Sequence, residues 1–378
     1  MEKRFVYADN AATTAISPYV LEKMLPFLTE QYGNASSVYS IGRKARTAVE
    51  TAREQIAAAI SCSPEEIFFT SGGTESDNWA VRGICESAGS EKNHIITSAI
   101  EHHAVLNTCR FLEKKGYRIT YIPADSSGTV DPADIEKAIT PETALVSLMY
   151  ACNETGVIQP VSETGEICRR YGIPFHTDAV QAAGHLRINV HEQNISLLSV
   201  SGHKLHAPKG IGILYIRKGT NISNLMFGGV QENALRPGTE NTAAIVGLGA
   251  AFENLSSDMD ANRRHTEKIR NHLESRLLES KKISVNGING TRLPGISNIS
   301  VKGADGEQIL LMLDLKGICA SAGSACTSGS SEPSHVLKAM GLSDAAAYSS
   351  LRFSFDHLSS ADDADYIADV LNEILRKI

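Results

Sequence analysis

Short apolar segments alternate with helical patterns over most of the first 216 residues. Strands are predicted at 67–70, 95–98, 118–122, 144–149, 173–176, 195–200 and 211–216, and helices between them at 104–115, 132–139 and 163–171. This alternation is typical of a mainly parallel sheet with helices on both faces. Ligands of such sheets bind beyond the carboxyl ends of the strands. The polar residues at or just after those ends are therefore candidate site residues: His102, Asn153, Asp178, Gln181 and Lys204.

The length of 378 residues is sufficient for two domains. A charged amphipathic helix over 263–278 is predicted to lead into the second domain, which ends in a helix capped by Ser360. We expect a large domain over 16–258 and a small α+β domain formed by 1–15 and 259–378. The apolar segment at 5–8 could pair with either domain.

Composition excludes several classes of protein. The net charge of −7 argues against direct binding of nucleic acid, and no apolar run approaches the length of a membrane span. The first residues lack the apolar segment of a signal peptide. The seven cysteines are scattered, without a CxxC pair, which predicts free thiols and a reducing cytoplasm rather than disulfides or a metal site.

The segment 199–210 contains the residue with the most specific chemistry, Lys204. A lysine between two buried strands can act as a nucleophile toward an aldehyde. Ser201 and His203 offer donors for a phosphate, and Asp178 lies at a strand end upstream. Pyridoxal 5′-phosphate, an aldehyde with a phosphate and a basic ring nitrogen, would use all four side chains. Alone, Lys204 could equally be a solvated turn residue and Asp178 a helix cap.

Two other segments favour a ligand site. The turn at 71–76 follows a strand and opens a helix, so its backbone N–H groups can face a phosphate, although helix capping explains it as well. The loop at about 321–335 is small, polar and glycine-rich, with Cys326 at its centre. We expect this loop to be mobile, as a thiol that travels to a substrate requires. An incidental surface thiol is the alternative.

Together these segments resemble the cysteine desulfurases of the NifS/IscS type, which are class V aminotransferase-like, fold-type I pyridoxal-phosphate enzymes. The resemblance covers essentially the whole chain. Its motifs are Asp-Asn-Ala-Ala-Thr-Thr at 9–14, Ser-Gly-Gly-Thr-Glu-Ser at 71–76, Glu-His at 101–102, Asn-Glu-Thr-Gly at 153–156, His-Thr-Asp-Ala-Val-Gln at 176–181, Ser-Gly-His-Lys at 201–204, Arg-Pro-Gly-Thr-Glu-Asn at 236–241 and Gly-Ser-Ala-Cys-Thr-Ser at 323–328. It implies a large domain with a mainly parallel seven-stranded sheet and a small domain that carries the cysteine loop.

The resemblance also implies roles around the cofactor. Lys204 would bind the cofactor covalently and shuttle protons, Asp178 would pair with the ring nitrogen, and His102 would stack on the ring and serve as acid or base. His103 competes with His102 for that place, and the motif favours His102. The remaining cofactor contacts would come from Gly73, Thr74, Asn153, Gln181, Ser201, His203 and, across a dimer, Thr239.

The implied reaction converts L-cysteine to L-alanine and leaves the sulfur on Cys326 as a persulfide. Arg352 would bind the substrate carboxylate with its bidentate fork, with Asn153 and Asn34 as further substrate contacts. Arg352 could instead form an ordinary ion pair at a strand end. No metal is expected.

The implied partners are a second copy of the chain and a sulfur-acceptor protein, such as an iron–sulfur scaffold or a tRNA-thiolation protein. Ala35, Tyr39, Val230 and Asn233 depart from the usual pattern in loops of the expected dimer region. The alternatives are a selenocysteine lyase or aminotransferase of the same fold, and a scaffold without catalysis. A binding module without a cofactor is a further alternative.

Overall fold

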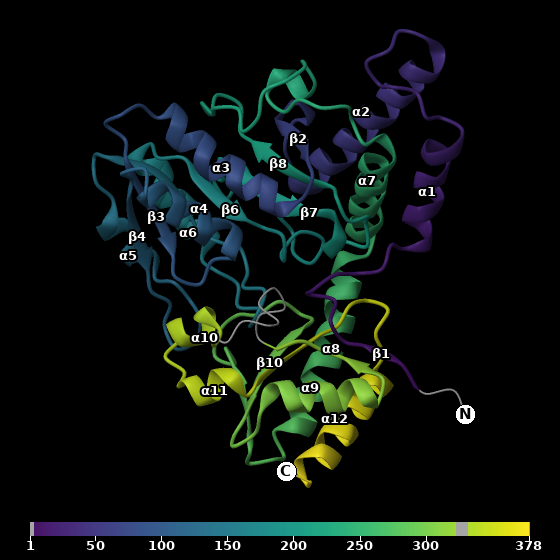
Figure 1. Cartoon of the computed structure of the whole chain (residues 1–378), viewed down its shortest axis with the longest axis vertical. Helices are drawn as coiled ribbons and strands as arrows, with labels where there is room; N and C mark the ends of the chain where they lie inside the picture. The colour runs from purple at the N-terminus through teal and green to yellow at the C-terminus, as the bar shows by residue number, and fades with distance from the viewer. Residues whose placement is uncertain (1–3, 323–331, 378) are drawn as a thin grey trace.

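The computed structural model describes residues 4–322 and 332–377, which form two packed regions (Figure 1). The larger region contains a seven-stranded sheet, as the sequence predicted, in the order β2-β8-β7-β6-β5-β3-β4. Its strands are β2 (Ile67–Thr70), β3 (His94–Ser98), β4 (Arg118–Ile122), β5 (Thr143–Ser147), β6 (Phe175–Asp178), β7 (Leu197–Ser201) and β8 (Gly212–Ile216). Strand β8 runs antiparallel to both of its neighbours, and the other pairs are parallel.

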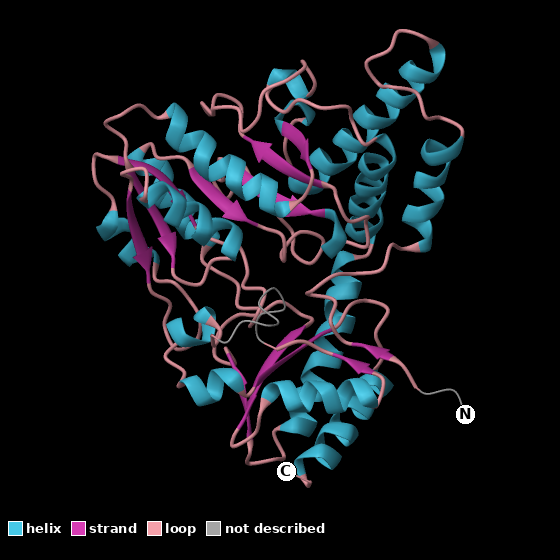
Figure 2. Ribbon diagram, in the orientation of Figure 1, coloured by secondary structure: helices cyan, strands magenta, loops and turns pink. Residues whose placement is uncertain are grey.

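Helices cover both faces of this sheet (Figure 2). The helices of this region are α1 (Pro18–Thr29), α2 (Ser40–Ile60), α3 (Gly73–Ser87), α4 (His103–Glu113), α5 (Pro132–Ala138), α6 (Val161–Tyr171) and α7 (Thr242–Ser257). Successive strand residues alternate between the faces, so Phe68 packs with α3 and α4 while Phe69 packs with α2 and α7. Both cores are almost completely buried, which fixes the strand ends that carry the polar residues.

The smaller region contains a three-stranded antiparallel sheet in the order β12-β10-β9. Its strands are β9 (Ile283–Asn286), β10 (Ile296–Val301) and β12 (Ser350–Ser354), and its helices are α8 (Met259–Leu277), α9 (Gly306–Leu315), α10 (His335–Ala339), α11 (Asp344–Tyr348) and α12 (Ala361–Leu375). Ser360 caps α12, as predicted, and accepts a hydrogen bond from the Asp363 N–H. A separate apolar cluster centred on Leu273, Ile299 and Leu371 forms the core of this region.

The N-terminal strand β1 (Val6–Tyr7) pairs in parallel with β11 (Ile318–Cys319) and therefore belongs to the smaller region (Figure 1). The chain then crosses into the larger region before α1. None of the helices in the described part of the chain is both long and apolar enough to cross a bilayer.

Candidate active site

The carboxyl ends of the parallel strands and the N-terminal crossover enclose a cavity of about 320 Å³. Ten of the predicted site residues line it: Gly73, Thr74, His102, Asn153, Asp178, Gln181, Ser201, His203, Lys204 and Arg352. They come from both regions and from positions up to 279 residues apart in the chain (352 − 73). The strand-end residues that were expected to converge, His102, Asn153, Asp178, Gln181 and Lys204, therefore lie around one cavity.

Two predicted positions lie elsewhere. Asn34 and Thr239 are exposed and do not line the cavity, so within one chain neither reaches the other site residues. Cys326 and most of the loop predicted around it lie outside the described residues. The part of that loop that the structure describes ends at His335, whose Nε2 donates to the Glu101 carbonyl at 2.9 Å.

Lys204 ends a short 3₁₀ turn, Gly202–Lys204, directly after β7. Its ammonium donates hydrogen bonds to the carbonyls of Ala11 and Ala12, at 2.5 and 2.6 Å. These carbonyls belong to the N-terminal crossover, which also accepts a bond from the Gln181 amide at 3.0 Å. The crossover therefore places the lysine and the glutamine on one wall of the cavity.

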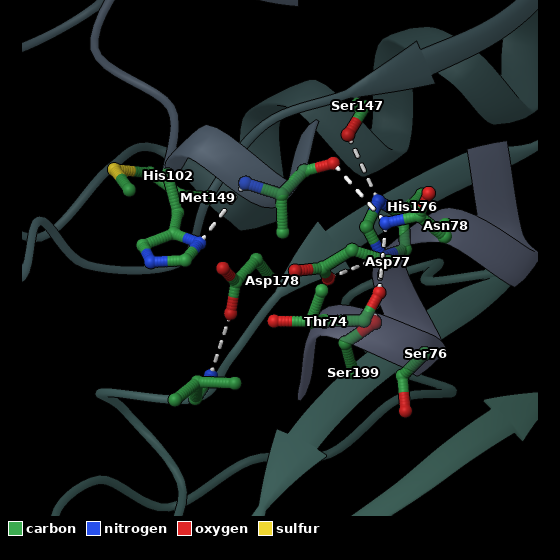
Figure 3. A network of polar contacts seen from close by, with 12 residues as sticks. Thr74, Ser76, Asp77, Asn78, His102, Ser147, Met149, His176, Asp178 and Ser199 are labelled. Carbon is green, nitrogen blue, oxygen red and sulfur yellow. Dashed lines mark hydrogen bonds and ion pairs between the residues drawn. The ribbon is translucent and has the colours of Figure 1, made fainter. Parts of the chain in front are cut away.

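Asp178 ends β6 and is almost fully buried, with its Oδ1 accepting the Val180 N–H at 2.9 Å. Burial raises the pKa of this carboxyl, and the nearby His102 and Lys204 lower it. His102 caps α4, and its Nδ1 accepts the Ala104 N–H at 3.1 Å, so the neutral ring carries its proton on Nε2. Figure 3 shows His102 and Asp178 side by side at the cavity.

A second buried carboxyl, Asp77, lies between Asp178 and His176 (Figure 3) and also lines the cavity. Burial and the neighbouring Asp178 charge raise the pKa of Asp77 well above its ordinary range. The adjacent His176 bonds to the hydroxyls of Ser147 and Ser199 at 2.8 and 3.0 Å, and burial lowers its pKa to about 3. Burial therefore raises the pKa of both carboxyls, Asp77 and Asp178, and both line the cavity, with the neutral His176 ring beside Asp77.

Sequence reasoning missed Asp77, although a signal was available. Asp77 lies between Ser76 and Trp79 on a helix face whose other members are small or apolar. An acidic residue on a buried helix face is expensive unless it has a structural or functional partner. Asp77 was therefore a candidate site residue, but it lies one position after the motif at 71–76 and was not assigned.

Arg352 lies on β12 and is 1% exposed. Its Nη1 donates to the Asn153 carbonyl and its Nη2 to Asp9 Oδ1, both at 2.8 Å. Asp9 Oδ2 in turn accepts the Ser321 hydroxyl at 2.8 Å. The guanidinium is held in one orientation at the edge of the cavity, beside Asn153.

The opposite end of the cavity is suited to an anion. Helix α3 begins at Gly73, where a Cβ would lie 2.7 Å from Val180 Cγ2, so the backbone approaches closely only as glycine. Ser201 and His203 face the same space. Burial and the neighbouring Lys204 lower the pKa of His203 to about 4.

Comparison with known proteins defines the class. The family model described as aminotransferase class V matches residues 6–367, and the chain belongs to this family. Its cofactor is pyridoxal 5′-phosphate.

Individual relatives narrow the comparison. The chain is 48% identical to a protein named cysteine desulfurase IscS from Methanosarcina thermophila, over 100% of this chain and 93% of that one. A solved structure titled "NifS-like protein" matches with a TM-score of 0.94 at 37% identity, over 99% of this chain and 100% of the other. A structure titled "SspA in complex with cysteine" matches with a TM-score of 0.84 at 37% identity, covering 94% and 100% of the two chains.

The residues present fit the cofactor. The cavity offers a buried carboxylate for the ring nitrogen and a helix N-terminus with hydroxyl and imidazole groups for the phosphate. An amine, Lys204, lies between them for the aldehyde. Two features carry this fit: the buried carboxyl pair Asp77–Asp178 and the close contact of the Gly73 backbone with Val180. Burying two carboxyls side by side is unfavourable unless a ligand compensates for it.

Proposed function

We propose that the protein is a cysteine desulfurase, which converts L-cysteine to L-alanine and keeps the sulfur as a persulfide on Cys326. The observation that carries this proposal is one cavity that holds an amine, a buried carboxylate and a fixed arginine. The amine and carboxylate suit the cofactor, and the arginine suits the carboxylate of an amino-acid substrate. Relatives named cysteine desulfurase, at 46–49% identity over nearly the whole chain, support the choice of substrate.

Bound in the cavity, pyridoxal phosphate supplies an electron-withdrawing ring that stabilises negative charge next to the substrate amine. Asp178 would keep the ring nitrogen protonated, and Gly73, Thr74, Ser201 and His203 would hold the phosphate. Gln181 would bond the ring oxygen, and His102 would lie against the ring. Lys204 would hold and move a proton at Nζ, which the Ala11 and Ala12 carbonyls position at the cavity wall.

Arg352 orients the substrate. Its two outer nitrogens are already bonded to the Asn153 carbonyl and to Asp9, so the guanidinium cannot rotate away from the cavity. A carboxylate that approaches the remaining donors meets a planar fork in a fixed orientation.

The overall reaction transfers one sulfur atom. The thiol of Cys326 and L-cysteine give a cysteine persulfide and L-alanine, with the carbon–sulfur bond broken and the sulfur–sulfur bond formed. A proton replaces sulfur on the substrate carbon. The persulfide is then passed to an acceptor for iron–sulfur cluster assembly or tRNA thiolation.

The first experiment is an absorbance spectrum of the purified holoenzyme before and after L-cysteine, with Lys204→Ala and Cys326→Ala alongside. We expect a visible cofactor band that shifts with cysteine, absent from Lys204→Ala, and alanine formation that Cys326→Ala abolishes. Full alanine formation by Cys326→Ala would reject the persulfide step and favour a lyase of another branch. Absence of any band after reconstitution would reject the enzyme.

The protein is proposed to work as a homodimer, with Thr239 reaching the cofactor phosphate of the other subunit. Thr239 is exposed and lies near the exposed side chains of Phe227 and Val230, which are 90% and 83% accessible. Apolar side chains this exposed are typical of surfaces that a partner covers. Residues 16–258 would form the large domain, and 1–15 with 259–378 the small one.

A reducing, cytoplasmic setting is proposed from the cysteines. The six described cysteines, Cys62, Cys85, Cys109, Cys152, Cys168 and Cys319, are all unpaired. Free thiols in this number are typical of proteins that fold in reducing compartments.

A further inference from the structure

A cluster of ligating side chains joins the two regions behind the cofactor cavity. His206 comes from the larger region, two residues after Lys204, while Asp356 and His357 follow β12 in the smaller region. One ligand atom of each residue lies within 4.8 Å of the other two. His206 and Asp356 are buried and His357 is half-buried.

The backbone at His206 indicates that its side chain matters. Its φ is 58°, in the left-handed region that usually selects glycine or asparagine. This region is unfavourable for a residue with a Cβ. The His206 N–H donates to the Thr14 hydroxyl at 2.9 Å, which holds this conformation. Unfavourable backbone conformations of this kind are concentrated at functional sites, where surrounding contacts hold them.

Hydrogen bonding fixes the His206 tautomer. Nδ1 lies 3.1 Å from the Ala15 carbonyl, which only accepts, so Nδ1 carries the proton. In the neutral ring Nε2 is then a lone pair, and it faces Asp356 Oδ2 at 3.2 Å. Two acceptors at this distance need a cation between or upon them, either a second proton on the ring or a metal ion.

The distances match a metal. Zinc binds imidazole nitrogen and carboxylate oxygen at about 2.0–2.2 Å, so two ligands of a tetrahedral ion lie about 3.3–3.5 Å apart. The His206–Asp356 separation has nearly this value already. His357 would have to turn inward, and its ring nitrogens have no hydrogen-bond partner among residues 4–322 and 332–377 that this turn would break.

The cluster has room for one ion. His206, Asp356 and His357 line a cavity of about 20 Å³, together with His185. One water needs roughly 10–15 Å³, so the cavity holds one water-sized occupant beside the three side chains. Arg263 lies at the rim of this cavity with an exposed side chain, so water screens its charge.

We propose that His206, Asp356 and His357 bind one divalent transition-metal ion of the Zn²⁺ type, with water at the fourth position. Two imidazoles and a carboxylate are ligands that this class of ion prefers. The ion would fasten the loop that follows Lys204 to the loop that follows the Arg352 strand. The site is structural and independent of the proposed reaction.

The test is zinc retention by the cofactor-loaded protein, in a Cys326→Ser background that removes one competing thiol. Parent, His357→Ala, Asp356→Asn and His265→Ala proteins are dialysed against buffered Zn²⁺, and metal per chain is measured by mass spectrometry. His265 is the matched control, because its Nε2 donates to the Ser359 carbonyl in the same loop but lies outside the cluster. His357→Ala is the decisive variant, because Asp356 also accepts the Leu358 and Ser359 N–H groups that shape the loop.

We expect the parent and the His265→Ala protein each to retain one more zinc ion per chain than either His357→Ala or Asp356→Asn. An anomalous X-ray signal at the zinc edge should lie between His206 Nε2, Asp356 and His357. Equal zinc in the parent and His357→Ala would overturn the site and leave a protonated His206 paired with Asp356. Zinc that the anomalous signal places elsewhere would overturn it as well.

Discussion

At the scale of single residues, Arg352 illustrates how a buried charge is made available to a substrate. Its neighbours on β12 are buried, and Asp9 and the Asn153 carbonyl bind its two outer nitrogens. Removing a charge from water is expensive unless a partner compensates for it. Asp9 supplies that compensation, and it comes from the N-terminal crossover rather than from the strand itself.

Arg352→Lys tests the proposed role of the guanidinium. A lysine keeps the charge, but a single ammonium cannot serve Asp9, the Asn153 carbonyl and a substrate carboxylate together. We expect KM for L-cysteine to rise about tenfold or more, which corresponds to about 1.4 kcal/mol. The visible cofactor band should be unchanged.

Arg270→Lys is the matched control. Arg270 is also buried and donates to the Leu293 carbonyl, but it does not line the cavity. That variant should lose stability without a change in KM. A wild-type KM in Arg352→Lys would show that another group binds the carboxylate.

His94 gives a prediction on acid stability. The ring is fully buried between the hydroxyls of Thr143 and Thr120, both at 2.9 Å, and burial lowers its pKa to about 4. The unfolded chain takes up a proton near pH 6.5 and the folded chain only near pH 4. Between these values the unfolded state binds more protons, so this residue makes the folded state less stable as the pH falls.

His94→Gln should therefore show a shallower loss of unfolding free energy between pH 6.5 and 4, measured by urea denaturation at several pH values. The same substitution at His191 is the control, because that side chain is 52% exposed. Parallel pH profiles for His94→Gln and the wild type would contradict the assignment.

At the scale of elements, periodicity predicted the long strands and helices because each buries one continuous apolar face. Strands β2 and β4 occupy the predicted ranges, 67–70 and 118–122. The short helices α10 and α11 were not predicted, since five residues carry too little pattern and owe their form to tertiary contacts. The local sequence pattern also did not predict that β8 runs antiparallel to its neighbours, because strand direction depends on how the chain returns to the sheet.

The candidate site was predictable to the extent that strand ends converge. His102, Asp178 and Lys204 follow strands that the sequence identifies, so their meeting follows from the parallel sheet. Asp9 and the carbonyls of Ala11 and Ala12 were not assigned, since only the tertiary fold brings the N-terminal crossover to Lys204 and Arg352. Long-range contacts of main-chain carbonyls cannot be predicted from the local sequence, because every residue has the same carbonyl group.

Helix α6 provides a test of packing at the level of an element. At Gly165 a Cβ would lie 2.0 Å from the Gln193 carbonyl oxygen, so the helix can approach the 189–195 segment only as glycine. Gly165→Ala should lower the unfolding free energy by about 1–3 kcal/mol, since backbone atoms must move apart. Activity per folded molecule should be retained, because α6 does not line the cavity.

Ser162→Ala, an exposed position on the same helix, is the control for that measurement. It should change the free energy of unfolding by less than about 0.5 kcal/mol. If Gly165→Ala were as stable as Ser162→Ala in urea, the close approach of α6 to Gln193 would be wrong.

At the scale of the whole molecule, the cavity is assembled from both regions. Arg352 and Asp9 belong to the smaller region, while Lys204 and Asp178 belong to the larger one. Relative movement of the regions would therefore separate the proposed substrate clamp from the proposed cofactor site. Contacts between the two regions, such as His206 with Asp356, oppose that movement.

The proposed homodimer adds a further level of assembly and yields the last prediction. Phe227 is 90% exposed and belongs to the same surface segment as Thr239, which does not reach the cavity of its own chain. A stable dimer interface buries roughly 1,200–2,000 Å² and has an apolar centre. A carboxylate introduced at that centre would lose its water without gaining a partner of opposite charge. Phe227→Glu should therefore shift sedimentation velocity from dimer toward monomer. It should also weaken cofactor retention on dialysis, measured by the visible band, because Thr239 of the other subunit would be lost from the phosphate.

Leu315→Glu, at a 72% exposed position on α9 of the smaller region, is the control and should remain a dimer and keep the cofactor. A dimeric Phe227→Glu protein with wild-type cofactor retention would exclude this surface as the interface, and monomers that keep the cofactor as tightly as the dimer would exclude a shared site.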